Sequence, residues 1–352
     1  MKSPTKTRAG IIGTALSFLL LIQLLARYPR FVETYYSNGL YRIINIFVSN
    51  FSSQFPFSFT EFCVWFILII GVPLYIGRIR KKKPTLGRLV LNVLTGISIL
   101  IIWFYLFWGI NYFRVPIKAK LGLDRVHLQK TALDSTFTDI IHHVNKLNLS
   151  YPVHSMAAIN NLVDASYRAA LKDSLLSGFQ PEKTIKTFAV NGILNKTTTS
   201  GFFSPFFHEV HYNSDLLTFE LPFVIAHEKA HAIGYTSESE ANFIAFLICK
   251  TSSDALVRYS AYFYLLGYFF SNVRSDSTKY RSYVNALSAG VKLDLSAVRE
   301  RWKAHRGFIS KLSNKSYDMY LKANKVEEGI HNYSMVVDLV VRYYAKNNLL
   351  KN

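Results

Sequence analysis

Cysteine is scarce in this chain of 352 residues, which contains only Cys63 and Cys249. Each of the two lies inside an apolar run. A disulfide framework needs several paired cysteines, and a thiolate zinc site needs a cluster of them, so the sequence excludes both. A metal site in this chain would have to be built from His, Asp and Glu side chains.

Acidic residues are also few, since 22 Asp and Glu stand against 41 Lys and Arg and the formal net charge is +19. Such a charge is typical of nucleic-acid binding, of contact with an anionic membrane, or of the cytoplasmic loops of a membrane protein. The stretch RIRKKKPTLGR (78–88) is rich in Lys and Arg, contains no acid and is enclosed by two apolar runs. This placement favours membrane topology and anionic lipid, and we expect no nucleic-acid partner.

Apolar residues make up 50% of the chain, and three runs of them, at residues 11–26, 62–77 and 89–113, predict transmembrane helices. The third is easily long enough to cross a hydrocarbon core of about 30 Å. The first could instead be a signal-peptide core and the second a buried globular helix, but no small-residue cleavage site follows the first run. We therefore expect a membrane region at residues 1–114 and a second domain at residues 115–352.

The basic loop also predicts orientation, because Lys and Arg are enriched in cytoplasmic loops. The N-terminus and the loop would be cytoplasmic, so the chain is expected to be a multi-pass protein of the cytoplasmic (inner) membrane whose C-terminal domain is extracytoplasmic. Between the first two runs, YRIINIFVSNF (41–51) places Ile and Phe at helical spacing, a pattern that suits a helix lying flat on the bilayer.

The second domain is expected to be mainly helical with a small sheet. Apolar residues recur at helical spacing in residues 133–147 and 155–176. Residues 183–213 carry Gly, Pro and Asn among short apolar alternations, which predicts strands and loops. Helical periodicity resumes at LPFVIAHEKAHAI (221–233) and continues almost to the C-terminus.

The stretch HEKAH predicts a metal site. His227 and His231 are four residues apart and share a helix face, so both can bind one ion, while Glu228 is turned aside but stays near the outer coordination position. Neutral imidazoles leave Zn²⁺ acidic enough to lower the pKa of its bound water, and an unliganded carboxylate can take the proton. We therefore predict a Zn²⁺ site with Glu228 as general base.

The residues that follow supply a third ligand. Gly234 is placed to end the helix in a left-handed cap, and Ser237 with Glu240 forms a capping-box signature for a second helix. That helix would present Glu238 to the histidines in its first turn. Glu238 is the predicted ligand and Glu240 the rival, while Asn242, one turn further on, can hydrogen-bond a liganding histidine.

This pattern of H-E-x-x-H, a Gly turn and E-x-E-A-N resembles the gluzincin-type metallopeptidases, whose third ligand is a glutamate followed four residues later by Asp or Asn. The whole chain is also similar to an uncharacterised family of bacterial multi-pass membrane proteins, domain of unknown function 3810. The similar motifs run from VETYYSNGLYR and WGINYFR through GFFSPFFHEVHYN to RYSAYF and YLKAN. The resemblance implies three N-terminal transmembrane helices followed by an α+β zincin-like metallopeptidase domain with a small sheet.

Two functions fit these expectations. The first is a membrane-anchored zinc-dependent metallopeptidase that hydrolyses peptide bonds of envelope or extracytoplasmic proteins, with the lipid bilayer and a peptide or protein substrate as partners. The alternative is a non-catalytic, metal-stabilised scaffold of the cell envelope. Glu228 favours the enzyme, because a structural site has no use for an unliganded carboxylate there.

Other polar residues have weaker claims to a role. His208 and His211 lie in GFFSPFFHEVHYN, a segment that resembles in position the edge strand that holds the substrate backbone in gluzincins. Tyr259, His331 and Tyr333 are further candidates for donors to a tetrahedral intermediate. For all five, ordinary packing or a surface position is the simpler interpretation.

Overall fold

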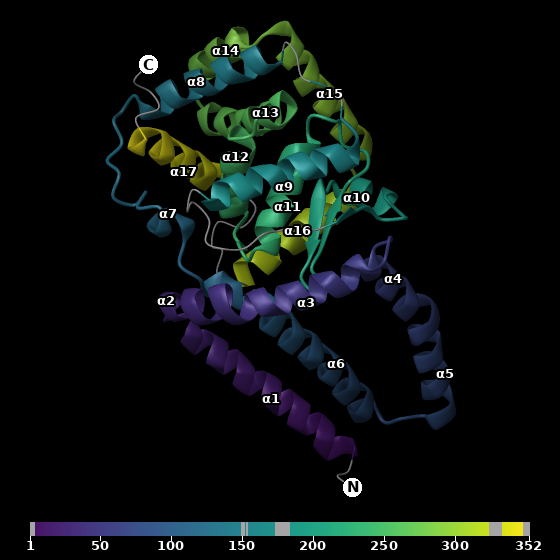
Figure 1. The fold of residues 1–352 in the computed structure, drawn as a ribbon. Helices are drawn as coiled ribbons and strands as arrows, with labels where there is room; N and C mark the ends of the chain where they lie inside the picture. Colours follow the sequence, from purple (N-terminus) through teal and green to yellow (C-terminus); the bar gives the residue numbers. More distant parts are fainter. Residues whose placement is uncertain (1–3, 149–151, 153, 173–183, 324–332, 348–352) are drawn as a thin grey trace. The chain divides into compact units, whose positions relative to one another are not determined.

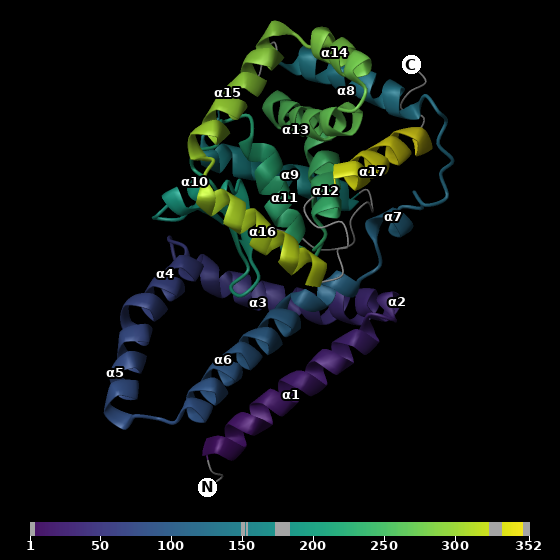
Figure 2. The same ribbon diagram turned by 180° about the vertical axis from the view of Figure 1, so that it is seen from behind.

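The computed structural model describes residues 4–148, 152, 154–172, 184–323 and 333–347 (Figures 1 and 2). Its helices are α1 Pro4–Leu25, α2 Pro29–Phe31, η1 Val32–Leu40, α3 Tyr41–Ser53, α4 Phe59–Phe66, η2 Ile67–Gly71, α5 Val72–Lys82, α6 Leu86–Phe107, η3 Gly109–Phe113, α7 Ile117–Lys120, α8 Ala132–Leu147, α9 Met156–Lys172, α10 Gly192–Thr197, α11 Leu221–Ala232, α12 Glu238–Lys250, α13 Ala255–Val273, α14 Ser277–Ala286, α15 Ala289–His305, α16 Phe308–Ala323 and α17 Tyr333–Lys346. Its strands are β1 Ile185–Lys186, β2 Gly201–Ser204 and β3 Glu209–Tyr212. The prediction of a mainly helical chain with a small sheet is confirmed.

The chain forms two compact units. The first consists of Met1–Val115 and Ser204–Glu209, and the second of Pro116–Phe203 and Val210–Asn352. The sequence did not show that residues 204–209, the tip of the β2–β3 hairpin, group with the N-terminal unit.

Three helical segments of the first unit are long and apolar enough to cross a membrane, namely Lys6–Leu25, Phe59–Lys82 and Leu86–Phe107. The second of these is one continuous helical run of α4, η2 and α5. The third ends earlier than the apolar run that predicted it, because Trp108 leaves the helical region with φ −155° and Gly109–Phe113 form a 3₁₀ turn. Extension of the third span to Phe113 was therefore wrong, although the three apolar helices are confirmed.

The hairpin tip is held within the first unit by a buried carboxylate. Glu209 accepts hydrogen bonds from the backbone N–H groups of Phe59 (2.9 Å) and Thr60 (2.7 Å), at the N-terminus of α4. An anion is favoured there by the free N–H groups and the helix dipole. Phe207 packs edge-on against Phe59, with ring centroids 4.9 Å apart, and against Trp103 of α6 at 5.8 Å. The tip is thus fixed to the second and third candidate spans.

The core of the second unit lies around α11, α12 and α13. Every residue of α11 is buried except His227, as expected for a helix that opens with the apolar run Leu-Pro-Phe-Val-Ile-Ala. The helices α12 and α13 pack on α11, and α8, α9 and α17 pack around this group. This arrangement places the predicted metal motif on a rigid, buried helix.

The small sheet has the strand order β1-β3-β2. The strand β1 runs parallel to β3, with Ile185 opposite Val210 and Lys186 opposite His211. β2 and β3 form a hairpin closed by a turn at residues 205–208, so β2 is the outermost strand of the described sheet on its side. Residues 183–213 also contain the short helix α10, where only strands and loops had been predicted.

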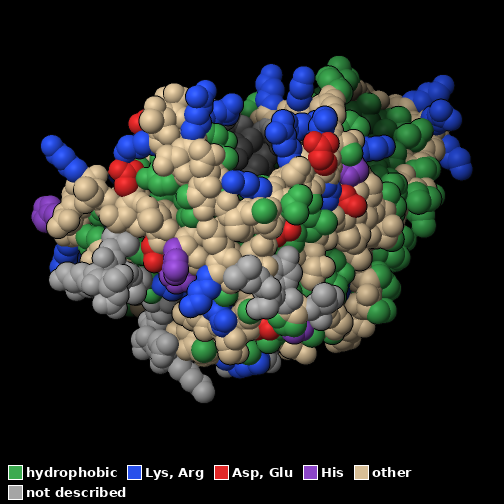
Figure 3. Space-filling view, turned by 90° about the horizontal axis from the view of Figure 1, so that it is seen from above, with side chains coloured by type: hydrophobic (Ala, Val, Ile, Leu, Met, Phe, Trp, Pro, Cys, Tyr) green, Lys and Arg blue, Asp and Glu red, His purple; other side chains and the backbone are tan. Residues whose placement is uncertain are grey.

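On the face drawn in Figure 3, basic side chains are spread over the surface rather than gathered into one patch.

Candidate metal centre

The end of α11 is shaped by a glycine. Gly234 has φ 87°, which allows the N–H of Tyr235 to bond the carbonyl of Ala230 (3.1 Å) and the N–H of Gly234 to bond that of His231 (2.9 Å). These two bonds form a Schellman motif, as the predicted left-handed glycine cap requires. The chain reverses there and α12 begins with Glu238.

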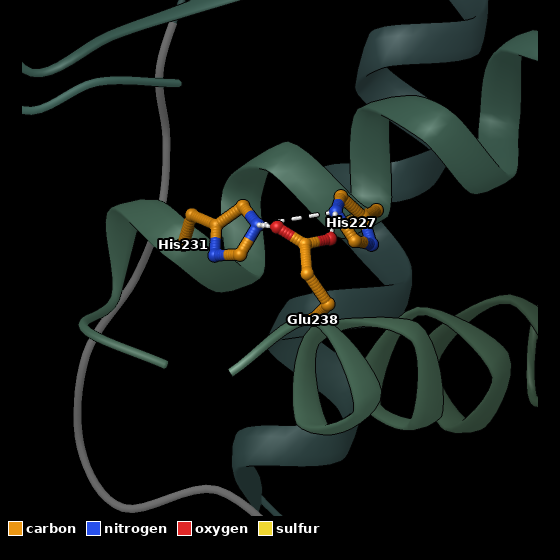
Figure 4. Close-up of side chains that lie close together, drawn as sticks. All are labelled: His227, His231 and Glu238. Carbon is orange, nitrogen blue, oxygen red and sulfur yellow. Dashed lines mark hydrogen bonds and ion pairs between the residues drawn. The ribbon is translucent and has the colours of Figure 1, made fainter. Parts of the chain in front are cut away.

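Two histidines of α11 and the first residue of α12 meet at this reversal (Figure 4). The Nε2 atom of His227 lies 3.2 Å from Oε2 of Glu238, and the Nε2 atom of His231 lies 3.4 Å from Oε1 of the same carboxylate. The two Nε2 atoms are 3.1 Å apart. Among the described residues, this trio is the group of His, Cys, Asp and Glu side chains that could hold a metal ion.

These distances fit the ligand set of a zinc ion. Zinc ligands lie about 2.0–2.1 Å from the ion, so two of them in a tetrahedral site are about 3.3 Å from each other. The three separations of 3.1, 3.2 and 3.4 Å are close to that value. Two imidazole lone pairs at 3.1 Å repel each other unless a proton or a cation lies between them. Two neutral imidazoles and one carboxylate are a donor set that zinc commonly takes in catalytic sites, with the fourth position open.

The tautomer of His231 is set by the turn. Its Nδ1 lies 2.7 Å from the carbonyl oxygen of Tyr235, which can only accept, so Nδ1 carries a hydrogen and, in the neutral ring, the lone pair is on Nε2. Burial opposes a charge on this ring, but the carboxylates of Glu238 and Glu228 outweigh it and raise the pKa of His231 to about 9. A metal ion that bound here at neutral pH would therefore have to displace a proton from His231.

Glu228 lies beside the three candidate ligands and is not one of them. Its side chain is buried, and burial raises its pKa above the ordinary value, although His227 and His231 oppose that shift. The backbone N–H of Phe203 in β2 hydrogen-bonds the carboxylate. A base with a raised pKa is better matched to proton transfer near neutral pH.

Gly201 makes this approach of β2 to Glu228 possible. A Cβ atom at position 201 would lie 2.6 Å from Oε1 and 2.8 Å from Cγ of Glu228, and 2.8 Å from Cγ1 of Val224. All three distances are shorter than van der Waals contact, so a side chain at 201 would displace the strand or the carboxylate. The glycine thus marks a site of close backbone approach.

The helix α11, which carries the HEKAH motif, is held in place by contacts with α9. Lys229, inside the HEKAH motif, is fully buried, and its Nζ donates to Oδ1 of Asn160 (2.7 Å) and forms an ion pair with Asp164. The hydroxyl of Tyr167 donates to the carbonyl of Ala226 (2.6 Å). Removal of one partner of such a buried pair typically costs about 3–5 kcal/mol. These contacts hold α11, and with it both histidines, in one orientation.

The structure separates the two rival carboxylates. Oε1 of Glu240 accepts a hydrogen bond from the backbone N–H of Ile117 (2.7 Å) instead of closing a capping box. Ser237 is the N-cap of α12, but its side chain makes no capping bond and its hydroxyl lies 2.9 Å from that of Ser239. The predicted capping box is therefore wrong in its hydrogen bonds, although the helix begins where it indicated.

Asn242 does not have the contact predicted for it. Within the described part of the chain it hydrogen-bonds neither histidine. Nδ1 of His231 is hydrogen-bonded to the carbonyl of Tyr235 instead, and Nδ1 of His227 is buried with no hydrogen-bond partner. The hydrogen bond that orients the candidate ligand His231 therefore comes from Tyr235 in the turn after α11, and not from α12.

The weaker candidates lie in other surroundings. His208, in the first unit, has its Nδ1 3.1 Å from Oδ1 of Asn45, and the buried His211 has its Nδ1 3.1 Å from the carbonyl of Phe202. The hydroxyl of Tyr259 donates to Asp294. His331 and the side chain of Tyr333 lie outside the described residues.

Comparison with known proteins places the chain in a family. A family model described as a protein of unknown function (DUF3810) matches residues 36–341. The chain belongs to the DUF3810 family. No curated protein and no solved structure matches it. The match covers both units of this DUF3810 protein, including the residues of the candidate centre.

Sequence reasoning missed several residues that build the centre. Asn160 and Asp164 are spaced i, i+4 on an amphipathic helix, a signal that could have indicated a shared polar partner. Gly201 stands between polar residues and two phenylalanines, where an isolated glycine in a strand pattern can mark a close backbone approach. The carbonyl of Tyr235 and the N–H of Phe203 carry no sequence signal, because they are backbone groups.

The geometry predicts which carboxylate binds zinc. Glu238→Gln should weaken zinc binding by more than the roughly 10- to 100-fold typical for loss of an outer-shell partner, because a direct ligand is lost. Glu240→Gln makes the same chemical change two residues away and should keep the parent affinity, because its Oε1 can still accept from Ile117. Competition of the purified full chain with a chelator measures both affinities. Loss of zinc from Glu240→Gln alone would contradict the assignment.

Proposed function

We propose that this DUF3810 protein is a membrane-anchored zinc-dependent metallopeptidase that hydrolyses peptide bonds of envelope or extracytoplasmic proteins. The observation that carries the proposal is the group of His227, His231 and Glu238, whose ligand atoms have the spacing of zinc ligands. Beside them the Glu228 carboxylate is buried but not part of the ligand group. A zincin-like arrangement of helix and strand is the fold that this pattern supports.

Each residue of the candidate centre has a separate role in the proposed reaction. When bound, zinc would act as a Lewis acid on the substrate carbonyl and on water. Glu228 would accept the proton of the attacking water and pass it to the leaving amine, a role for which its raised pKa is suited. The outermost strand β2 would hold an extended peptide by strand addition, and through Phe203 it holds the base. Lys229 would hold α11 in position against α9 through its ion pair with Asp164.

Hydrolysis is the direct test of the proposal. The zinc-loaded full chain, reconstituted in lipid, is incubated with an unbiased peptide library and with solubilised envelope proteins, and new termini are identified by mass spectrometry. Cleavage by the parent protein and its loss in His227→Ala support a peptidase. If the zinc-loaded parent cleaves nothing while His227→Ala lowers its thermal stability, the centre is a structural metal site of an envelope scaffold.

The proposed orientation places the second unit outside the cytoplasmic membrane, because the basic loop between α5 and α6 belongs inside. Alkaline phosphatase fused after Asn352 should be active and a fluorescent protein fused there should be dark, since each folds on one side of the membrane only. Fusions after Lys83 should give the reverse pattern and serve as the control. Fluorescence from the fusion at Asn352 would overturn both the orientation and the envelope-substrate assignment.

A further inference from the structure

The helix α3 of the first unit has its two faces reversed relative to a helix of a soluble protein. Phe47 is 73% exposed, and Ile43 and Ile46 are 55% and 51% exposed. On the opposite face Asn45 and Ser52 are buried. A water-soluble protein buries the apolar face of a surface helix and leaves the polar face in solvent. The exposed face of α3 therefore needs a partner other than water.

The buried polar face is occupied by the hairpin tip, which belongs to the same unit. Oδ1 of Asn45 lies 3.1 Å from Nδ1 of His208, and the ring of Tyr41 lies 5.6 Å from that of His208. Ser49 donates its hydroxyl to the carbonyl of Asn45 at 2.5 Å, and Ser52 donates to the carbonyl of Ser49 at 3.1 Å. The buried polar side chains of α3, Asn45, Ser49 and Ser52, thus have partners within the protein, and the apolar face points away from the hairpin tip.

The direction of α3 differs from that of the candidate spans. Both ribbon views show α3 running across the end of α6 rather than alongside it (Figures 1 and 2), and α3 contacts α6. In the chain it lies between the first and second candidate spans. If α6 crosses a bilayer, a helix that crosses its end lies at the boundary between hydrocarbon and water.

The composition of this segment fits that boundary. Between residues 34 and 60 the one charged residue is Arg42. Phe55 and Phe57 follow α3, and their rings are in contact with each other and with Phe59 and Phe62 of α4. Aromatic side chains gather at the membrane interface, and contiguous exposed apolar patches typically mark contact with a membrane or another partner.

We propose that α3 is an in-plane membrane anchor, with the side chains of Ile43, Ile46 and Phe47 inserted at the boundary between lipid headgroups and acyl chains. The bilayer is the occupant because α3 lies in the chain between two candidate spans that are apolar and almost entirely unburied. The anchor does not depend on the metal centre. It would fix the hairpin tip, which packs on its polar face, at the membrane surface.

Spin labels can test the position of this face in liposomes of phosphatidylethanolamine and phosphatidylglycerol. The full chain with Cys63→Ser and Cys249→Ala carries one nitroxide at position 47, 69 or 293. Ile69 lies within the second candidate span, and Leu293, on α15 of the second unit, is 70% exposed and thus a matched apolar control for Phe47. Oxygen should relax the labels at 47 and 69 several-fold more than a water-soluble nickel chelate, with the label at 47 at the shallower depth. The label at 293 should show the opposite preference.

Two results of the spin-label experiment would overturn the proposal. A label at 47 as accessible to nickel as that at 293 would place the face in water, and a label shielded from both reagents would mean that protein covers it. A second measurement uses the unmodified chain, in case the cysteine replacements impair folding. A lipid-soluble diazirine should label residues 41–51 as it labels the spans, and absence of label from these residues would equally overturn the anchor.

Discussion

Replacement of Glu228 by glutamine should lower peptide hydrolysis by about two to four orders of magnitude while zinc binding is kept, the loss expected when a general base is removed. The carboxylate is buried beside the ligand group and is not part of it, so the charge that takes the proton can be removed without loss of a ligand. The amide is nearly isosteric, and its oxygen can still accept the hydrogen bond from Phe203. Cleavage rates, zinc content and melting temperature of the purified full chain measure the three effects.

Glu300→Gln provides a matched control, because it removes the charge of an exposed carboxylate whose ion pair with Lys303 is also exposed. Surface ion pairs of this kind contribute about 0–1 kcal/mol, so rate and stability should stay at the parent values. Equal rates for Glu228→Gln and the parent would contradict the assignment of the base. The ligand assignment would survive that result, because zinc content is measured separately.

The parts of this protein that could be predicted from sequence are those that depend on local patterns. The apolar runs predicted three candidate spans because length and hydropathy are local properties. The i, i+4 spacing of His227 and His231 and the glycine at 234 fixed a helix and its end, and the short connection left Glu238 opposite the histidines. In each of these examples, the residues that interact are within about a dozen positions of one another.

The features that sequence reasoning missed depend on contacts between distant segments. Glu240 had a plausible local partner in Ser237, but a backbone N–H 123 residues away binds it instead. The hairpin tip looked like part of the second domain, yet Glu209 binds the N-terminus of a helix 149–150 residues earlier. Backbone groups such as the N–H of Phe203 have no residue-type signature, so the position of β2 against Glu228 could not be predicted.

The close approach of β2 to Glu228 leads to a second prediction with a large expected effect. Gly201→Ala should lower hydrolysis by about 10- to 100-fold while zinc content remains at the parent value, since a shift of about 1 Å in a catalytic group can cost about 100-fold. The added methyl would lie 2.6 Å from Oε1 and 2.8 Å from Cγ of Glu228, so the strand or the base must move. The three atoms nearest to the added methyl belong to Glu228 and Val224, not to the candidate ligands His227, His231 and Glu238. Rates and bound zinc are measured on the same preparation.

Gly267→Ala is the matched control for this substitution. A Cβ atom there has no heavy atom within 4 Å, and the residue lies inside α13. Its rate should equal that of the parent, and its stability should rise by up to about 1 kcal/mol, the helix preference of alanine over glycine.

The decisive comparison is the double variant with Glu228→Gln. If Gly201 acts by allowing β2 to position the Glu228 carboxylate, Gly201→Ala should cost little further activity once that carboxylate is gone. An undiminished 10- to 100-fold loss in the Glu228→Gln background would show that the strand acts on the substrate directly and not through the base.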